Sequence, residues 1–576
     1  MARYDLVIRG GLIVDGARNP RYKGDVAIKD GRIARMGRVP RGQAEREIDA
    51  EGLVVAPGFI DLHTPYDAQV FWDPYLTTSG TNGVTSVVIG NCGFGFAPMR
   101  EEHRERAMQS MTKVEAIPLA TLEATMPWDW VTYPEMLDSI DRAPKAVNLL
   151  PYIGVNPMLI WVMGLEDAKS GRKPTAEETA QLKRLLHEAM DAGACGWSTQ
   201  TLGTPGDPTA ETAGGAAQSD YDGTPMPSDV MWPETLRALA EVLGERGEGF
   251  VEMSAAHLPR EIWEELAEIS GAPFIYQALP ASDMMIDMNE DLFAWFERCR
   301  EKGLRIYGQG ITQNPPLVMT FDYWDLWGPV WTGFTGPEVP RAEKLANFAD
   351  PAVREKLRAE PLKHMLIASI DQAKVSTVKS RENERFVGKT IGEIAQELGK
   401  HPVDAICDLV VSDELGDELR AAAIRHRPRR SQAAARQSLD HPGPLGRRCA
   451  PRVPRRRRLC DGADRRVRTR ARDPEPRGGA LAALGLARLL RGLPDRGVLR
   501  EGAAADIVVY DCENLAYEFE LRPRPAGRQY RVVSGGQGYR YVLVNGQVTI
   551  EDDERPTTTR VSCCAAGRGQ ADRASA

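Results

Sequence analysis

Short apolar runs alternate with helical segments through the middle of the chain, and this alternation restricts the fold more than any other pattern in it. The clearest helix begins after Thr175, where Thr175 and Glu178 match a capping box, and its apolar stripe ends at Gly193. Strands alternating with helices over about 400 residues imply a parallel sheet and favour an α/β fold of the (β/α)8 TIM-like barrel type over a doubly wound sheet. The runs typical of buried strands are 84–90, 147–150, 249–253, 273–276 and 304–308.

Both ends of the chain contain short strand-like runs joined by tight turns. Near the N-terminus a run at 25–28 leads into the turn Asp30-Gly31, and near the C-terminus Asn545-Gly546 joins two runs. Each half alone is too small for a stable core, so we expect one small β-sandwich built from both chain ends rather than two separate units. The predicted domains are 1–58 and 495–555 for the halves of the sandwich, 59–494 for the barrel, and 556–576 for a disordered or off-frame tail.

The composition argues against several classes of protein. The net charge of -8 and the pI of about 5.7 argue against a general affinity for nucleic acid or for an anionic membrane. The chain starts without an apolar leader segment, and no apolar run reaches the ~20 residues that span a bilayer. Nine cysteines lie scattered without a disulfide framework. We therefore expect a cytoplasmic protein with reduced thiols and with no nucleic-acid or membrane partner, and the oligomeric state stays open.

Two runs carry a specific resemblance to a known family. The run Pro57-Gly58-Phe59-Ile60-Asp61-Leu62-His63-Thr64 resembles the first barrel strand of the amidohydrolase superfamily, and 83–98, with Gly90-Asn91-Cys92-Gly93, resembles the second-strand signature of its N-acyl-D-amino-acid deacylase (D-aminoacylase) branch. The likeness extends over about 1–420 and 495–550. It implies hydrolysis of the amide in a small N-acyl-D-amino acid by zinc-activated water, with an eighth-strand Asp moving the proton.

The resemblance gives metal-binding roles to His63 and Cys92. The family's first strand normally ends in His-X-His, but here the second position is Pro65, and proline has no lone pair for a metal. A lone histidine is more often structural than a ligand, and a small buried cysteine is often only part of a core. The position of His63 at a strand end, and the glycines beside Cys92, which allow a close approach of the backbone, favour a site.

Further family ligands are histidines on the fifth and sixth strands, where this chain has none. Glu252 and Gln277 could supply oxygens there, but only weakly, and His257 reads as a loop histidine. Gln277 and Gln309 are the expected substrate contacts. Because catalytic zinc needs three protein ligands and only two candidates remain, two interpretations stay open. One is a metal-dependent amidohydrolase, and the other is a catalytically silent barrel that binds a small ligand or a protein partner.

Residues 421–500 differ in composition from the rest of the chain. They contain 22 Arg and six acidic residues but no Lys. This stretch should supply the eighth strand and an Asp-Gly-Gly-type motif, yet no such motif occurs, so the catalytic acid has no assignment. A basic insertion that binds nucleic acid, a solvated charged loop and an out-of-frame reading of GC-rich DNA are the alternatives. We favour the last, because ordinary composition returns near residue 495.

Overall fold

The computed structural model describes residues 3–554 with the exception of several internal segments. Those segments are 18, 116, 202–219, 223, 255–257, 281–285, 312–316, 322–328, 337–338, 360–369, 417, 422–494 and 524–529. The aberrant stretch at 421–494, apart from its first residue, the tail at 556–576 and His257 therefore lie outside the described residues. No helix in the described part of the chain is long and apolar enough to cross a membrane.

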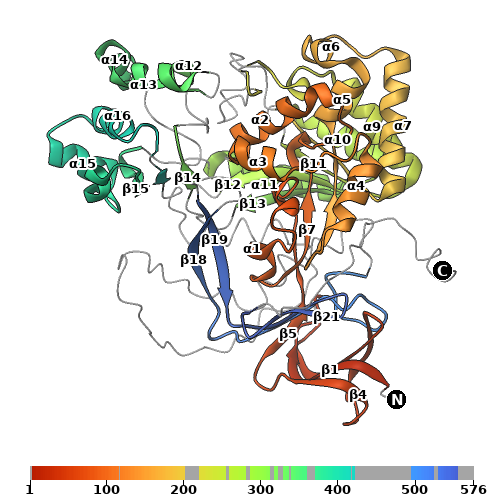
Figure 1. Ribbon diagram of the computed structural model, residues 1–576. Coiled ribbons are helices and arrows are strands. Elements are labelled where there is room, and N and C mark those ends of the chain that lie inside the picture. The colour runs from red at the N-terminus through yellow and green to blue at the C-terminus, as the bar shows by residue number, and fades with distance from the viewer. Residues whose placement is uncertain are drawn as a thin grey trace.

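The two chain ends meet in one eight-stranded sheet, called here the terminal sheet. Strand β5 pairs on one side with β1 and on the other with β17, so that Pro57 lies opposite Ile507 across an antiparallel ladder. Both faces of the sheet pack apolar side chains, and Figure 1 shows it at the bottom of the view, next to the N-terminus. Its strands are β1 (Tyr4–Ile13), β2 (Tyr22–Lys29), β3 (Arg32–Gly37), β4 (Ala44–Asp49), β5 (Val54–Pro57), β17 (Ile507–Tyr510), β20 (Tyr539–Val544) and β21 (Gln547–Glu551).

Parallel strands follow one another in chain order through the middle of the molecule. They form the series β6-β7-β8 and the series β9-β10-β11-β12-β13, and β8 and β9 are two pieces of one strand interrupted at Tyr152. The expected fold class, an α/β barrel with a small β unit from both chain ends, is confirmed. The strands are β6 (Phe59–Asp61), β7 (Val84–Ile89), β8 (Asn148–Pro151), β9 (Ile153–Gly154), β10 (Gly196–Gln200), β11 (Phe250–Ser254), β12 (Phe274–Pro280) and β13 (Ile306–Ile311).

Helices pack against the outside of these strands (Figure 1). The capping box at Thr175 is present: the Glu178 amide donates to Thr175 Oγ1 at 3.2 Å, and the Thr175 amide donates to Glu178 Oε2 at 2.7 Å. The helices are α1 (Thr77–Gly80), α2 (Arg104–Glu115), α3 (Leu119–Thr125), α4 (Tyr133–Arg142), α5 (Val155–Met163), α6 (Leu165–Lys169), α7 (Ala176–Ala192), α9 (Pro233–Arg246), α10 (Arg260–Ser270) and α11 (Ile286–Glu301).

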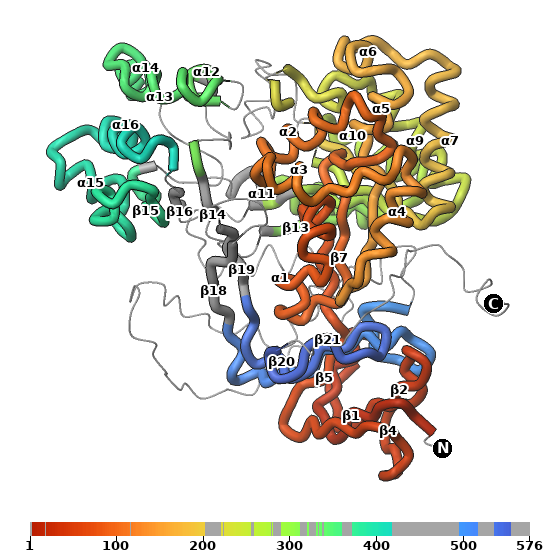
Figure 2. Tube along the Cα trace, in the orientation of Figure 1, coloured from red at the N-terminus to blue at the C-terminus, as the bar shows by residue number. Residues whose placement is uncertain are grey.

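The described residues between 317 and 421 form a group with its own apolar core, around Trp331, Phe348 and Ile406. Figure 2 shows its helices away from those that cover the barrel strands. The sequence analysis placed this segment within the barrel and did not separate it. Its elements are β14 (Leu317–Met319), α12 (Pro329–Thr335), α13 (Arg341–Ala349), α14 (Pro351–Ala359), β15 (Lys374–Thr377), α15 (Ile391–Leu398), α16 (Pro402–Ser412) and β16 (Glu418–Ala421). A separate antiparallel ribbon consists of β18 (Ala516–Pro523) and β19 (Tyr530–Gln537), and β19 contacts α1.

A buried carboxylate joins the barrel to the terminal sheet. Asp506, just before β17, accepts hydrogen bonds from Asn148 Nδ2 of β8 at 3.0 Å and from the Asn545 amide at 2.8 Å, and it pairs with Arg496. Asn545 Nδ2 also donates to Asn148 Oδ1 at 2.8 Å. This network sits at the amino end of the barrel strands, so it anchors the barrel on the sheet while the opposite ends stay available for a site.

Candidate metal centre

The loop after β7 has a left-handed backbone that packs closely against its neighbours, and its glycines make this conformation possible. Gly90 and Gly93 both have left-handed φ angles, +77° and +74°. A Cβ at Gly90 would lie 2.5 Å from the Tyr152 carbonyl oxygen, and one at Gly93 would lie 3.0 Å from Thr199 Cα. Cys92 between them is also left-handed, with φ 56°, which costs about 1–2 kcal/mol for a residue with a Cβ. Strain of this kind concentrates at functional sites, where surrounding contacts hold it.

Side-chain and backbone hydrogen bonds fix this loop to the end of β6. Asn91 Nδ2 donates to the Thr64 and Val88 carbonyl oxygens at 3.2 and 3.1 Å. Thr64 Oγ1 donates to the same Val88 oxygen at 2.7 Å, and the His63 amide donates to Asp61 Oδ1 at 3.2 Å. The residues that carry His63 and Cys92 are therefore held to each other, whereas Pro65 is exposed beyond them.

His63, Cys92 and Glu252 come together at the carboxyl ends of β6, β7 and β11. Cys92 Sγ lies 3.7 Å from His63 Nε2 and 4.0 Å from Glu252 Oε1, and His63 Nδ1 lies 4.0 Å from the same oxygen. We call these three residues the metal cluster. The predicted pair His63 and Cys92 is thus adjacent in space, and Glu252, which the sequence favoured only weakly, supplies a third donor.

Burial controls the charge of the metal cluster. It raises the pKa of Glu252 to about 8 and lowers the pKa of His63 to about 4. Burial, followed by the charge of Glu252, raises the pKa of the Cys92 thiol well above its usual value. Desolvation thus favours the neutral form of each group, and a bound cation would reverse this preference for the thiol and the carboxyl.

The three donors fit a divalent metal ion. One sulfur, one nitrogen and one oxygen within 4.8 Å of one another match a catalytic zinc site with three protein ligands. The ligands of tetrahedral zinc lie about 3.5 Å apart, slightly closer than the separations here. In addition, His63 Nδ1 is buried and has no hydrogen-bond partner in the described part of the chain. The sequence pointed to two candidate ligands, and the fold brings a third donor, the inward-facing Glu252 of β11, within reach of both.

Three glutamines and a serine lie at one level of the barrel, next to the metal cluster. Gln200 of β10 pairs with Ser254 of β11, and Gln277 of β12 pairs with Gln309 of β13. Ser254 Oγ lies 3.3 Å from Cys92 Sγ and donates to Glu252 Oε1 at 3.1 Å. The two predicted substrate contacts, Gln277 and Gln309, are thus direct neighbours across two strands. The sequence analysis did not single out Gln200. Its position two residues after Ser198 on the same strand means that the two side chains face the same side, and this spacing can be read from the sequence.

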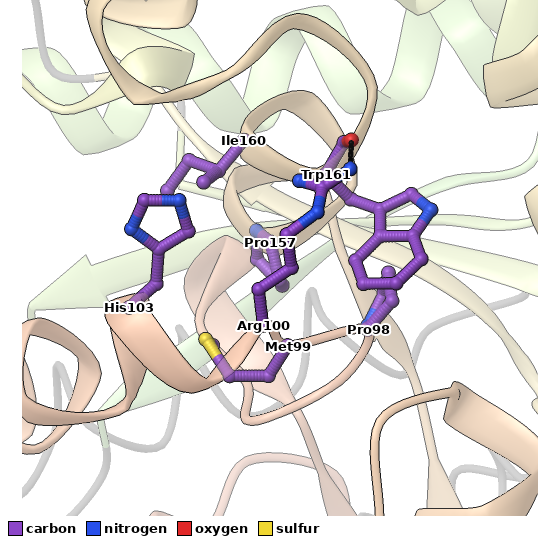
Figure 3. A pocket seen from close by; sticks show the side chains of 7 residues that line it. All are labelled: Pro98, Met99, Arg100, His103, Pro157, Ile160 and Trp161. Atoms are coloured by element: carbon purple, nitrogen blue, oxygen red, sulfur yellow. Dashed lines mark hydrogen bonds between the residues drawn. The ribbon is translucent and has the colours of Figure 1, made fainter.

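A separate shallow hollow lies between residues 98–103, which follow the loop that carries Cys92, and α5. Figure 3 shows Arg100 lying over the Trp161 ring, 4.3 Å from its centroid, and donating to the Trp161 carbonyl oxygen at 2.8 Å. His103 lines the same hollow. None of its lining residues belongs to the metal cluster, and its one guanidinium is already engaged, so we assign no chemistry to it.

Comparisons with known proteins find relatives for part of this chain. Residues 46–219 match the model of the amidohydrolase family. An N-acyl-D-aspartate deacylase of Alcaligenes xylosoxydans xylosoxydans is 34% identical over 204 residues, which are 35% of this chain and 38% of that enzyme. The aligned stretch therefore spans about two-fifths of this curated relative.

Two solved structures share the fold. A D-aminoacylase crystal structure aligns with a TM-score of 0.58 at 20% identity, covering 96% of this chain and 98% of the other. An N-acyl-D-glutamate deacylase from Bordetella bronchiseptica, solved with zinc and a phosphonate inhibitor, also gives 0.58 at 20% identity, covering 98% and 100%. The comparisons therefore confirm a resemblance to the amidohydrolase family over residues 46–219 and to an N-acyl-D-aspartate deacylase over part of the chain, and the two structures show a shared fold.

Proposed function

We propose that this chain, an amidohydrolase-superfamily protein of the D-aminoacylase branch, hydrolyses the C–N bond of an N-acyl-D-amino acid with the help of a bound metal ion. The observation that carries the proposal is the convergence of His63, Cys92 and Glu252 at the carboxyl ends of three barrel strands. Sites of barrel enzymes lie at this end of the strands. The substrate class is taken from the N-acyl-D-aspartate deacylase and the other relatives named above.

The mixed sulfur, nitrogen and oxygen donor set favours zinc over magnesium or calcium, which prefer oxygen ligands. When bound, zinc supplies Lewis-acid activation of water and of the acyl carbonyl. The described cysteines Cys92, Cys195, Cys299 and Cys407 are not in disulfides, which supports a proposed location in the reducing cytoplasm.

The residues of this chain position the reacting groups. Glu252 Oε2 accepts a hydrogen bond from the Cys92 amide at 2.7 Å. The same carboxyl group therefore stabilises the left-handed backbone at Cys92 and also faces the Cys92 sulfur. Ser254 donates to the other oxygen of Glu252 and orients it. The acid that moves the proton is expected on the eighth strand, whose place in the chain falls at 422–494, outside the described residues.

Metal analysis and an activity assay on the full chain test the proposal together. We expect about one zinc per chain by mass spectrometry after purification with zinc present, and release of acetate from N-acetyl-D-amino acids but not from their L-enantiomers. Cys92→Ser is expected to abolish zinc binding and acetate release, whereas Cys512→Ser, at an exposed cysteine, leaves zinc binding and acetate release unchanged. A folded chain that binds no metal and releases no acetate would instead support the catalytically silent barrel.

A further inference from the structure

The three glutamines and the serine beside the metal cluster form a continuous row across four neighbouring strands. Gln200 pairs with Ser254, and Gln277 pairs with Gln309. Met253 pairs with Tyr276, so the next residues, Ser254 and Gln277, are also neighbours. Residues paired in register on adjacent parallel strands point to the same face of the sheet. We call Gln200, Ser254, Gln277 and Gln309 the amide row.

The amide row faces the barrel interior. Ile275 and Tyr307, two residues before Gln277 and Gln309, pack in the interior cluster with Phe250, whereas Met253 and Tyr276 pack outward with the helices. Side chains two residues apart on a strand point the same way. Ser254 contacts the Cys92 sulfur directly, which places the row at the level of the metal cluster.

Amide atoms in the row lack partners among the described residues. Gln200 is only 1% exposed, yet its Nε2 makes no hydrogen bond, and neither Gln277 Oε1 nor Gln309 Oε1 makes one. Buried amide groups normally find partners, because an unmade hydrogen bond inside a protein is costly. Donors and acceptors left open at a candidate metal centre point to a ligand that supplies both.

Among the described residues, the strands that carry the amide row bring no lysine or arginine to it. The charged groups that act on the Cys92 thiol are Glu252, Glu115 and Asp67, all of them acidic. Two arginines that follow the loop carrying Cys92 already have partners: Arg100 donates to the Trp161 carbonyl oxygen, and Arg106 forms an ion pair with Asp220. The segments that hold β6, β7, β10, β11, β12 and β13 contain neither lysine nor arginine: 47–99, 185–236, 247–259, 261–297 and 306–340.

We propose, on the basis of the function above, that the amide row selects N-acyl-D-amino acids with an uncharged, hydrogen-bonding side chain, such as the carboxamide of glutamine or asparagine, and rejects those with an acidic side chain. A carboxamide offers a donor and an acceptor to the open amide atoms. A side-chain carboxylate placed at the amide row would meet no lysine or arginine of these strands and would lie next to other acidic groups, which is strongly unfavourable. This preference differs from those stated by the names of the aspartate and glutamate deacylases above.

The test compares N-acetyl-D-glutamine with N-acetyl-D-glutamate. The two compounds have nearly the same shape and share the α-carboxylate, so the comparison isolates the side-chain charge. We expect kcat/KM on the zinc-loaded chain to be at least about 100-fold higher for the glutamine derivative, because an unpaired carboxylate is costly to bury. Equal values, or a preference for the glutamate derivative, would overturn the proposal.

Calorimetric titration of both compounds separates this proposal from the proposed function. Tighter binding of the glutamine derivative without turnover leaves the selectivity standing and removes only the hydrolase activity. Binding of both with equal affinity, or of neither, overturns the selectivity.

An introduced cation provides the second test. Gln309→Arg adds a positive charge to the row and is expected to raise binding of the glutamate derivative about tenfold or more relative to the glutamine derivative. Gln396→Arg, at an exposed glutamine of α15, leaves the ratio unchanged. If Gln309→Arg does not fold, as judged by circular dichroism, Gln277→Arg takes its place, and an unchanged ratio in the folded variant contradicts the proposal.

Discussion

Glu252 contacts Cys92 twice: its Oε2 accepts the Cys92 amide hydrogen at 2.7 Å, and its Oε1 lies 4.0 Å from the Cys92 sulfur. The two residues are 160 positions apart in the chain. The carboxyl group therefore has a structural contact and a proposed metal-binding contact on different oxygens. Substitutions can separate these two contributions.

Glu252→Gln is expected to keep the fold and lose the metal. The amide oxygen still accepts the Cys92 amide hydrogen, but the anionic donor is gone, so zinc affinity should fall by at least about 100-fold. Competition with a chromophoric chelator measures the affinity. Glu261→Gln, at an exposed position of α10, serves as the control, and an unchanged affinity in Glu252→Gln would remove this residue from the ligand set.

Glu252→Ala is expected to lower the stability of the metal-free chain as well. The substitution leaves the Cys92 amide without its acceptor next to a strained turn, which costs about 1–3 kcal/mol of unfolding free energy. Urea denaturation of Glu252→Ala and Glu252→Gln measures the difference. Equal stability of the two variants would show that the hydrogen bond contributes little.

The stability of the metal-free chain should fall as the pH rises above 7. Burial raises the pKa of Glu252 from its ordinary 4.5 to about 8, so between these values the folded state binds a proton that the unfolded state has lost. Stability then decreases with rising pH and levels off near pH 8. Asp67 and Glu115, whose pKa values burial raises to about 7, contribute in the same direction but mainly below pH 7. Burial lowers the pKa of His63 from 6.5 to about 4, so His63 reduces the stability of the folded state only as the pH falls below 6.5.

Glu252→Gln isolates this effect. Thermal unfolding between pH 7 and 8, with chelator present, should show a smaller decrease in the variant than in the parent chain. Parallel curves would mean that Glu252 does not titrate in this range. Added zinc should remove the decrease in the parent chain, because the bound cation favours the ionised carboxylate.

Cys92 should be protected from alkylation by zinc. Without metal, burial keeps the thiol protonated and slow to react; with metal, the sulfur is a ligand and is blocked. Iodoacetamide labelling followed by peptide mass spectrometry measures the modification of Cys92 and of the exposed Cys512 in one sample. Zinc should slow only the first, and equal labelling with and without zinc would argue against coordination.

Asp506→Ala should destabilise the chain by about 3–5 kcal/mol, because it breaks the buried ion pair between Asp506 and Arg496. The same change removes the acceptor of Asn148 on β8. Denaturant unfolding measures the loss, with Asp552→Ala at the surface as the control. A loss below about 1 kcal/mol would mean that water replaces the network.

The fold was predictable from the sequence because its signals are local. Strand runs, the capping box at Thr175 and the turns Asp30-Gly31 and Asn545-Gly546 each report on a few neighbouring residues, and together they determined the α/β class. The exact domain boundaries stay predictions. The helical group at 317–421 was not separated, because its strands and helices have the same local patterns as those of the barrel.

The site was only partly predictable. His63 and Cys92 stood out through family motifs, but Glu252 did not, since the family places histidines on the corresponding strands. Its signal was a lone charged residue within the apolar run Phe250-Val251-Glu252-Met253. Which side chains meet at one level of a barrel depends on the register between strands far apart in the chain, and no local pattern encodes this register. The amide row was missed as a row for the same reason.

Pairing of β5 with β17 has a consequence for the order in which the molecule forms during synthesis. At ~5–20 residues per second, β17 leaves the ribosome roughly 20–90 seconds after β5. Until then one side of β5, whose residues Val54, Val55 and Ala56 are all buried in the finished sheet, is an unpaired apolar strand edge. Such edges are prone to pair with other chains. This edge of the N-terminal strands is therefore covered only after most of the chain has been synthesised, and a chain that stops before residue 507 never covers it.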